Sequence, residues 1–243
     1  MTKVINGDAR KMNLAEFDAP YGVIVADPPW NYTNGGVRGS AASQYVTMTI
    51  DDICEMPVSQ LAAKDGILFL WGTWPLLPEA LRVMTAWDFT YKTGFPWVKI
   101  NQNMALPPGV GFWVRGVSEF IFIGVRGNAK CPIPEKRYMG IIAPNLKHSR
   151  KPDSVHQIAE TLKPPYLELF AREGRIGWTC FGNEVTQANN RLQPTAFGAG
   201  GLASNSLQGS FIADESSATH RRRLKRTVGR LKQCGLITEV KET

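Results

Sequence analysis

Short apolar runs alternate with amphipathic stretches along this chain, and this alternation restricts its fold more than any other feature. Most of the runs are rich in β-branched and aromatic residues and are apolar on both faces, as strands buried between two layers are. They lie at residues 21–26, 66–71, 89–99, 119–125, 166–170 and 178–181. Apolar residues recur at helical spacing in segments 75–87 and 153–163. Strands that alternate with helices predict a doubly wound α/β sheet, which binds ligands at the carboxyl ends of its strands.

The composition changes after Arg191, where this alternation stops. Residues 195–218 are rich in Gly, Ser and Ala, which is the composition of a linker. Residues 219–243 hold eight Lys or Arg against two Glu, with apolar residues spaced along one helical face. We therefore expect a main domain over residues 1–190, a linker over 191–218 and then a flexible basic helical tail. A disordered basic end is the alternative for that tail.

Positive charge is concentrated in two blocks of the chain. The whole sequence has 28 Lys and Arg against 21 Asp and Glu, a formal net charge of +7. Residues 92–151 hold ten basic and two acidic side chains, a net of +8, and the tail 219–243 adds a net of +6. Such blocks predict a face that binds the phosphates of nucleic acid, although solvated surface lysines and arginines would give the same count.

The cysteines and the hydropathy indicate the compartment. Cys54, Cys131, Cys180 and Cys234 stand far apart with no Cys-x-x-Cys pair, and the chain has only three histidines. This pattern is typical of reduced thiols in the cytoplasm and argues against a structural zinc site. No apolar run approaches the roughly 18 residues that span a bilayer, and the first residues do not form a signal peptide. We expect a cytoplasmic protein without a metal and without a membrane partner.

Asp27-Pro28-Pro29-Trp30 follows the buried run 21–26 directly and is the most informative stretch for chemistry. The exocyclic amine of adenine is a poor nucleophile because its lone pair is delocalised into the ring. A carboxylate and a carbonyl that accept its two N–H bonds would localise that lone pair, and Asp27 and the Pro28 carbonyl could provide them. Trp30 offers a face on which a base taken out of its stack could rest, unless it is a core aromatic behind a Pro-Pro turn.

Further short motifs accompany this tetrapeptide over about residues 4–186. They are Gly7-Asp8-Ala9-Arg10, Leu68-Phe69-Leu70-Trp71, Trp97-Val98-Lys99-Ile100-Asn101, Gly124-Val125-Arg126-Gly127-Asn128, Ser149-Arg150-Lys151-Pro152-Asp153, Leu167-Glu168-Leu169-Phe170-Ala171-Arg172, and Gly177-Trp178 through Gly182-Asn183-Glu184. In this order the chain resembles the MT-A-type adenine N6-methyltransferases. That family contains the catalytic subunit of eukaryotic messenger-RNA adenosine methyltransferase and its bacterial and phage DNA-modifying relatives. One motif would be weak, whereas the ordered set is specific.

The resemblance implies a Rossmann-like methyltransferase fold with S-adenosylmethionine as the methyl donor. The implied catalytic residues are Asp27, Pro28, Pro29 and Trp30. The implied cofactor-binding residues are Asp8 at the adenine end with Ala9, Lys151 at the methionine carboxylate, Arg172 and Asn183 at the ribose, and Phe170 and Glu184. The chain departs from the eukaryotic enzymes in carrying Arg175 for a ribose-contacting asparagine and Glu184 for glutamine. It also has no G-x-G-x-x-G motif.

DNA is the substrate that we expect, because the short family members that lack RNA-targeting segments modify DNA. The basic segment 92–151 lies between the catalytic and cofactor motifs, where a loop could close over a nucleic-acid backbone. The candidate substrate-binding residues are Tyr32, Lys99, Asn101, Arg115, Arg137 and Arg150. An RNA adenine methyltransferase, a non-catalytic nucleic-acid-binding partner subunit and a protein glutamine methyltransferase are the alternatives. Whether the chain forms a homodimer stays open.

Overall fold

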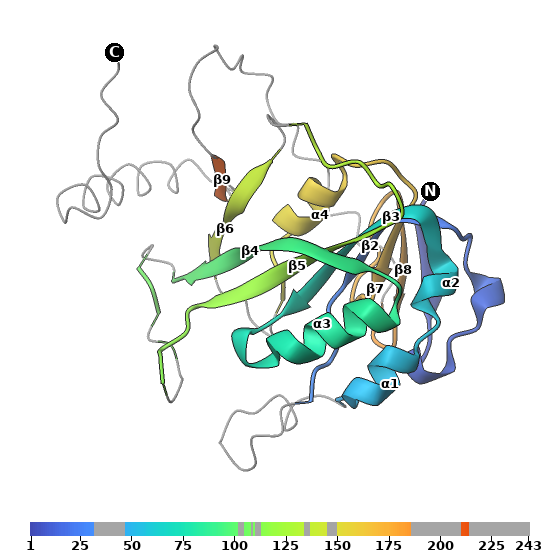
Figure 1. Ribbon diagram of the computed structural model, residues 1–243, viewed down its shortest axis with the longest axis horizontal. Helices are drawn as coiled ribbons and strands as arrows, with labels where there is room; N and C mark the ends of the chain where they lie inside the picture. The colour runs from blue at the N-terminus through green and yellow to red at the C-terminus, as the bar shows by residue number, and fades with distance from the viewer. Residues whose placement is uncertain are drawn as a thin grey trace.

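A mixed sheet forms the centre of the protein (Figure 1). The computed structural model describes residues 1–31, 47–101, 105–107, 109, 113–133, 137–144, 150–185 and 210–213. Within them the strands are β1 (Lys3–Asn6), β2 (Tyr21–Ala26), β3 (Ala62–Gly72), β4 (Thr90–Ile100), β5 (Ser118–Arg126), β6 (Tyr138–Pro144), β7 (Tyr166–Leu169), β8 (Trp178–Gly182) and β9 (Ser210–Ala213). The helices are α1 (Ile50–Glu55), α2 (Val58–Leu61), α3 (Leu77–Ala86) and α4 (Ser154–Ala159), with short 3-10 turns η1 (Ala9–Lys11), η2 (Leu14–Glu16) and η4 (Trp74–Leu76).

The strands lie in the order β1-β8-β7-β2-β3-β5-β4-β6-β9. The neighbours from β1 to β3 pair in parallel, and so do β4 with β6 and β6 with β9. Strand β5 runs antiparallel to both β3 and β4. The carboxyl ends of β1, β8, β7, β2 and β3 therefore meet at one edge of the sheet, and the residues that follow these strands lie along that edge.

Helices cover the sheet on both faces (Figure 1). On one face α1, α2 and α3 pack over a core that contains Ile24, Leu68 and Trp87. On the other face α4 packs over a core that contains Val25, Trp71 and Trp97. Alternate residues of β2 enter the two cores, which is why its sequence is apolar throughout.

Local sequence explains where the helices begin and end. Thr49 and Asp52 form a capping box at the start of α1, in which each side chain accepts a hydrogen bond from the other residue's backbone N–H. Pro78 lies in the first turn of α3, where its missing N–H has no helical partner to lose. After α3, Asp88 adopts a left-handed conformation with φ of 64° and turns the chain into β4.

The fold class predicted from the sequence is confirmed, and the elements differ in detail. Strand β2 has the expected bounds, whereas β3 begins at Ala62 rather than at residue 66. The segment expected as a helix over 75–87 divides into η4 and α3, and α4 is shorter than the expected 153–163. Strands β1, β6 and β9 were not predicted. Strand β9 lies within the stretch whose composition is typical of a linker, and residues 214–243, which include the predicted tail, lie outside the described residues.

Candidate active site

The two central parallel strands create the site. From β7 the chain continues to β8 on one side, whereas from β2 it continues to β3 on the other side. The two loops that follow β7 and β2 therefore diverge, and a doubly wound sheet binds its ligand in the crevice between such loops. Asp27 is the first residue after β2, and Phe170 is the first after β7. This is the switch point of the sheet, so the topology alone places Asp27 where a ligand would lie.

The tetrapeptide after β2 is held by backbone hydrogen bonds. The Trp30 N–H donates to the Pro28 carbonyl at 2.8 Å, and the Met48 N–H donates to the Pro29 carbonyl at 3.0 Å. The Pro28 carbonyl thus has one lone pair engaged within the turn and one left for another donor. Pro28 is buried and Pro29 is half-buried. Asp27 is therefore fixed on a rigid turn that offers no backbone N–H from either proline.

Trp30 is a core residue. Its side chain is 6% exposed within the core below α1 and α3, and its indole N–H donates to the Trp71 carbonyl at 3.0 Å. Of the two interpretations of this tryptophan, the described residues show the buried aromatic behind the turn. Trp30 fixes the tetrapeptide against the end of β3, and any role as a surface for the target base stays a prediction.

Asp27 belongs to a chain of alternating charges that four segments supply. Lys151 Nζ lies 2.8 Å from Asp27 Oδ2 and 3.4 Å from Glu119 Oε2, and Lys99 Nζ lies 2.5 Å from Glu119 Oε1. Lys151 also lies over the Trp71 ring, 5.4 Å from its centroid. The side chains of Asp27, Lys151 and Glu119 are 29%, 16% and 17% exposed. The structure thus brings Lys151 to the proposed catalytic carboxylate, and its predicted contact with a methionine carboxylate stays a prediction.

The surroundings set the pKa values of these groups. Burial raises the pKa of Asp27 above its ordinary value of 3.8, and Lys151 and then Arg172 offset only part of that rise. Burial alone would lower the pKa of Lys151, but Asp27 and Glu119 together raise it. Burial would likewise raise the pKa of Glu119, but Lys151 and Lys99 bring it below its ordinary value. At neutral pH Lys151 is therefore a cation between the Asp27 and Glu119 side chains, and Glu119 is a carboxylate.

Glu119 was not predicted as a site residue from the sequence. The family motif on the same strand, Gly124 to Asn128, lies at the other end of β5, so the resemblance did not point to the first residues of this strand. One signal was present, because Glu119 is one of only two acidic residues in the basic segment 92–151 and stands directly before the apolar run 120–125. An acid in that position needs a buried cation, and Lys151 and Lys99 provide two.

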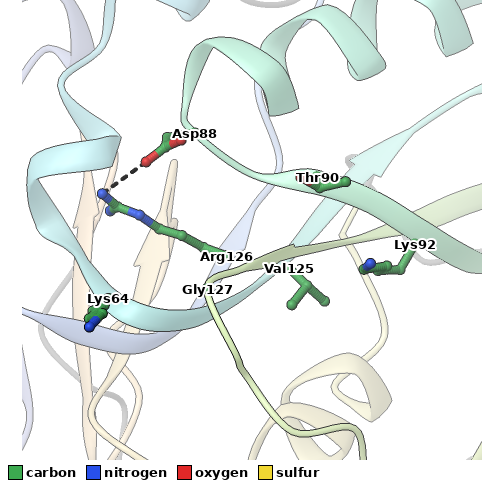
Figure 2. Close-up of a pocket in the computed structure, with 7 residues that line it drawn as sticks. All are labelled: Lys64, Asp88, Thr90, Lys92, Val125, Arg126 and Gly127. Carbon is green, nitrogen blue, oxygen red and sulfur yellow. Dashed lines mark ion pairs between the residues drawn. The ribbon is translucent and has the colours of Figure 1, made fainter.

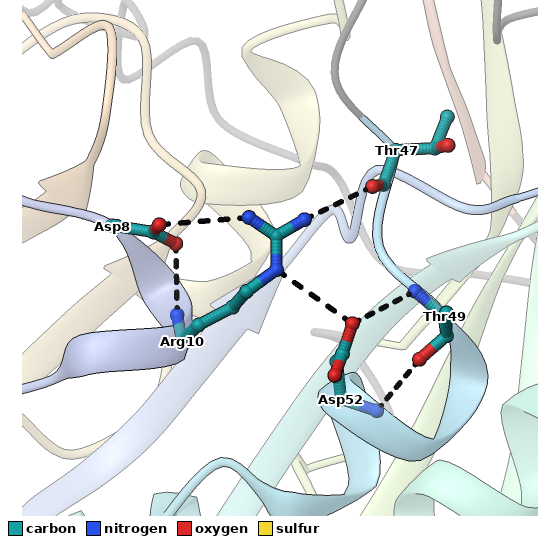
Figure 3. A network of polar contacts seen from close by, with 5 residues as sticks. All are labelled: Asp8, Arg10, Thr47, Thr49 and Asp52. Atoms are coloured by element: carbon teal, nitrogen blue, oxygen red, sulfur yellow. Dashed lines mark hydrogen bonds and ion pairs between the residues drawn. The ribbon is translucent and has the colours of Figure 1, made fainter.

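At the end of β1 the predicted cofactor residue Asp8 lies in a polar network (Figure 3). Asp8 caps η1 by accepting the Arg10 N–H at 3.0 Å, and the Arg10 side chain lies 3.5 Å from Asp8 Oδ2. Arg10 also donates to the Thr47 carbonyl at 3.2 Å and lies 3.6 Å from Asp52, a member of the α1 capping box. Ala9 packs against the core beneath. Arg10 therefore ties the Asp8 turn to the start of α1.

The other predicted cofactor residues line the same edge. Phe170 has a φ of 62°, a left-handed conformation that is rare for a bulky residue and that concentrates at functional sites. Arg172 lies close enough to lower the pKa of Asp27. Asn183 and Glu184 are exposed directly after β8. Arg175 instead forms an ion pair with Asp153 at the start of α4, so the structure gives that side chain a partner within the protein.

Gly182 lets the loops after β7 and β8 approach each other. A Cβ at Gly182 would lie 2.1 Å from the Ala171 carbonyl oxygen, a contact with backbone that cannot move aside cheaply. We expect Gly182→Ala to lower the free energy of unfolding by about 2 kcal/mol, the range of overpacked sites, in urea titrations. Gly116→Ala is the matched control, because its Cβ would meet no atom within 4 Å. Equal midpoints for the two variants would contradict this role of Gly182.

Most of the predicted substrate-binding residues contact other parts of the protein. Lys99 belongs to the charge chain, Asn101 caps a turn by accepting the Ala105 N–H, and Arg137 donates to the Pro132 carbonyl. Arg150 pairs with Glu173 at 3.4 Å, and Arg115 is exposed. Tyr32 lies outside the described residues. Most of these side chains thus have contacts within the protein, and their role toward a substrate stays a prediction.

A basic cavity of about 310 Å³ lies at the opposite edge of the sheet, lined by Lys64, Asp88, Thr90, Lys92, Val125, Arg126 and Gly127 (Figure 2). Arg126 is engaged there: it donates to the carbonyls of Ser59 and Ala62 at the end of α2 and pairs with Asp88 at 2.9 Å. This guanidinium therefore serves as a structural clamp, and the cavity is remote from Asp27.

The described residues contain neither a candidate metal site nor a helix that could span a membrane. No group of three or more His, Cys, Asp or Glu in the described part of the chain could hold a metal ion. Among the helices over the same residues, none has the length and apolar composition to cross a membrane.

The strand order and the acidic residue at the switch point define a Rossmann-like methyltransferase fold. Residues 21–184 match the MT-A70 family, and the chain belongs to this family of adenine N6-methyltransferases. It is 28% identical to the type II methyltransferase M.MunI of Mycoplasma sp. over 187 residues, which cover 68% of this chain and 78% of that protein.

Two eukaryotic relatives are also similar to this chain. The N(6)-adenine-specific methyltransferase METTL4 of Homo sapiens is 31% identical over 71% of this chain, and a probable N(6)-adenosine-methyltransferase MT-A70-like protein of Oryza sativa is 30% identical over 74%. The chain spans only 39% and 25% of those two proteins. The predicted family is thus confirmed.

Proposed function

We propose that this chain transfers a methyl group from S-adenosylmethionine to the exocyclic N6 amine of adenine in DNA. The observation that carries the proposal is Asp27 at the switch point of the sheet, on a rigid turn and paired with Lys151, in a member of the MT-A70 family. A carboxylate in that place can accept an N–H bond from an amine that enters the crevice.

The residues along the edge fit S-adenosylmethionine. Asp8 and Asn183 are exposed at the ends of β1 and β8, where a carboxylate and an amide suit an adenine amine and ribose hydroxyls. The strained backbone at Phe170 and the close approach at Gly182 shape the crevice between them. Arg172 and Lys151 are the cations nearest to Asp27 and suit an anionic carboxylate. When bound, the cofactor supplies an electrophilic methyl group on a sulfonium.

The chain's own groups then prepare the amine. The Asp27 carboxylate and the free lone pair of the Pro28 carbonyl accept the two N–H bonds of the adenine amine, so that the nitrogen lone pair becomes available. Lys151 keeps Asp27 ionised and oriented by its contact at 2.8 Å. The proton that the amine loses goes to Asp27 or to water, and the raised pKa of Asp27 favours that transfer. The protein thus acts by alignment and desolvation.

Two of the relatives, the type II methyltransferase M.MunI and METTL4, favour DNA over RNA as the substrate. A third relative, METTL3 of Homo sapiens, is named an N(6)-adenosine-methyltransferase. The name of METTL4 specifies adenine, the base, whereas the name of METTL3 specifies adenosine, the ribonucleoside. Parallel incubation of DNA and RNA with labelled methyl donor, followed by nucleoside analysis, tests the proposal: N6-methyladenine only in the RNA would favour the RNA enzyme, and none in either would overturn the activity.

If phosphate contacts dominate, the affinity for DNA should depend steeply on salt. For about four contacts, we expect the Kd to rise about 100-fold between 50 and 200 mM NaCl, as measured by fluorescence anisotropy. Arg115→Gln, at an exposed residue of the basic segment, should reduce the salt slope by about one. Arg82→Gln, at an exposed residue of α3 that pairs with Asp51, should leave the salt slope unchanged. A Kd that varies less than about threefold would contradict the prediction.

A further inference from the structure

Trp74 differs from the five buried tryptophans of the protein. Five of the seven, Trp30, Trp71, Trp87, Trp97 and Trp178, are at most 6% exposed. Trp74 is 54% exposed, although a large aromatic ring on a surface forfeits the burial that stabilises a core. Trp113 is also exposed, but it borders residues outside the described part of the chain.

The ring of Trp74 is exposed and yet fixed. Trp74 opens η4, where the Leu76 N–H donates to the Thr73 carbonyl and the Leu77 N–H donates to the Trp74 carbonyl. Its ring centroid lies 3.8 Å from that of Phe120, with 58° between the ring planes. Phe120 in turn stacks on the buried Phe122. A ring backed in this way presents its open face at little further cost in conformational entropy.

Trp74 also lies at the edge that carries the active site. It follows β3 by two residues, and β3 is the neighbour of β2, which ends at Asp27. Gly72, the last residue of β3, pairs with Phe120 on β5, next to Glu119 of the charge chain. The carbonyl of Trp71 accepts the indole N–H of Trp30. Strand β3 therefore connects Trp74 to the tetrapeptide, and strand β5 connects it to the charge chain.

We propose that Trp74, supported by Phe120, is a stacking site for an unpaired base that flanks the target adenine of the nucleic-acid substrate. An adenine that is taken out of its stack leaves a neighbouring base with one face uncovered, and an aromatic ring replaces that lost stacking. The site takes any base, because every base has a π face, and it adds no charge. This inference rests on the proposed function, since it requires a nucleic-acid substrate whose adenine enters the crevice beside Asp27.

Trp74→Ala tests the stacking directly through binding, which needs no turnover. The Kd of the full chain for adenine-containing single-stranded DNA and RNA oligonucleotides should rise about 5- to 100-fold, the range for loss of one stacked base. Trp74→Phe should recover most of the affinity, because it keeps a ring in place. The fold increase should be the same at 50 and 200 mM NaCl, because stacking, unlike a phosphate contact, releases no counterions.

Tyr91→Ala is the matched control. Tyr91 is another exposed ring in the same row of aromatic residues, and its ring centroid lies 6.3 Å from that of Phe122. It lies at the opposite edge of the sheet from Asp27. The proposal would be overturned by an unchanged Kd for Trp74→Ala or by an equal loss of affinity for Trp74→Ala and Tyr91→Ala. A change of particle size in gel filtration in place of a change in Kd would also overturn it. If the unaltered chain methylates DNA or RNA while Trp74→Ala binds normally, only this inference fails. If the unaltered chain methylates neither, the proposed function fails by itself.

Discussion

Asp27→Ala is expected to lower kcat for adenine methylation by about 100- to 10,000-fold, the range for loss of a group that handles a proton in the transition state. The alanine cannot accept an N–H bond from the adenine amine, so the nitrogen lone pair stays in the ring. Binding of S-adenosylmethionine, measured by calorimetry, should persist, because Asp8, Phe170 and Asn183 lie on other strand ends. Asp18→Ala, which removes an exposed partner of Lys3, is the control and should keep full activity.

The pKa of Asp27 adds a second, independent readout. Because burial raises this pKa, kcat/KM should fall with decreasing pH at a higher pH than the ordinary value of 3.8 would give. The stability of the fold has the opposite pH dependence, because a carboxyl whose pKa is raised on folding destabilises the fold as pH rises through that pKa. Asp27→Asn should therefore not lower the thermal midpoint at pH 7. Near-normal turnover by Asp27→Ala would refute the assignment of Asp27.

The sequence was sufficient to predict the fold class and the order of the site motifs. Buried strands such as β2 and β8 consist mainly of apolar residues, so they can be recognised in the sequence without knowledge of the strands beside them. Asp27, Phe170 and Asn183 follow such strands directly, and the topology then brings them to one edge. The residues that directly follow a buried strand can therefore be predicted from the sequence to lie at this edge.

The contacts between segments that are distant in the sequence could not be predicted from it. The pairing of Lys151 with Glu119 depends on the order of β2, β3 and β5 in the sheet, which no local pattern contains. The burial of Trp30 depends on the Trp71 carbonyl, 41 residues away. Strand β1 has four residues and a mixed composition, so its sequence alone gives no clear period.

Lys151→Met is expected to lower the free energy of unfolding by about 3 kcal/mol, measured by urea unfolding at pH 7.5. The substitution keeps the length of the side chain but leaves Asp27 and Glu119 facing each other without the shared cation, and removal of one partner from a buried ion pair costs this much. Methylation should be lost as well, because Asp27 then takes up a proton and can no longer accept an N–H bond.

The pH dependence separates this electrostatic role from simple packing. In the unaltered chain the pKa of Glu119 is lowered, so its contribution to stability is present above its unfolded value of about 4.5 and is lost as pH falls through the folded value. In Lys151→Met the pKa of Asp27 should rise further, and Glu119 loses the first of the two cations that lower its pKa, so stability should fall as pH rises. The deficit of the variant should therefore be small near pH 4 and grow toward pH 8. A deficit that is the same at both pH values would indicate packing alone.

Glu119→Gln in the Lys151→Met background completes the test. In the unaltered chain this substitution takes a carboxylate from both Lys99, at 2.5 Å, and Lys151, at 3.4 Å, so it should destabilise. In the Lys151→Met background it still takes the partner of Lys99, but it also removes the carboxylate that faces Asp27 without a shared cation. The loss of stability should therefore be smaller in that background by at least about 1 kcal/mol, the coupling energy between Lys151 and Glu119. Equal losses in the two backgrounds would show that these two residues do not interact. Methylation should stay absent in the double variant, because Asp27 still lacks the ammonium that keeps it ionised.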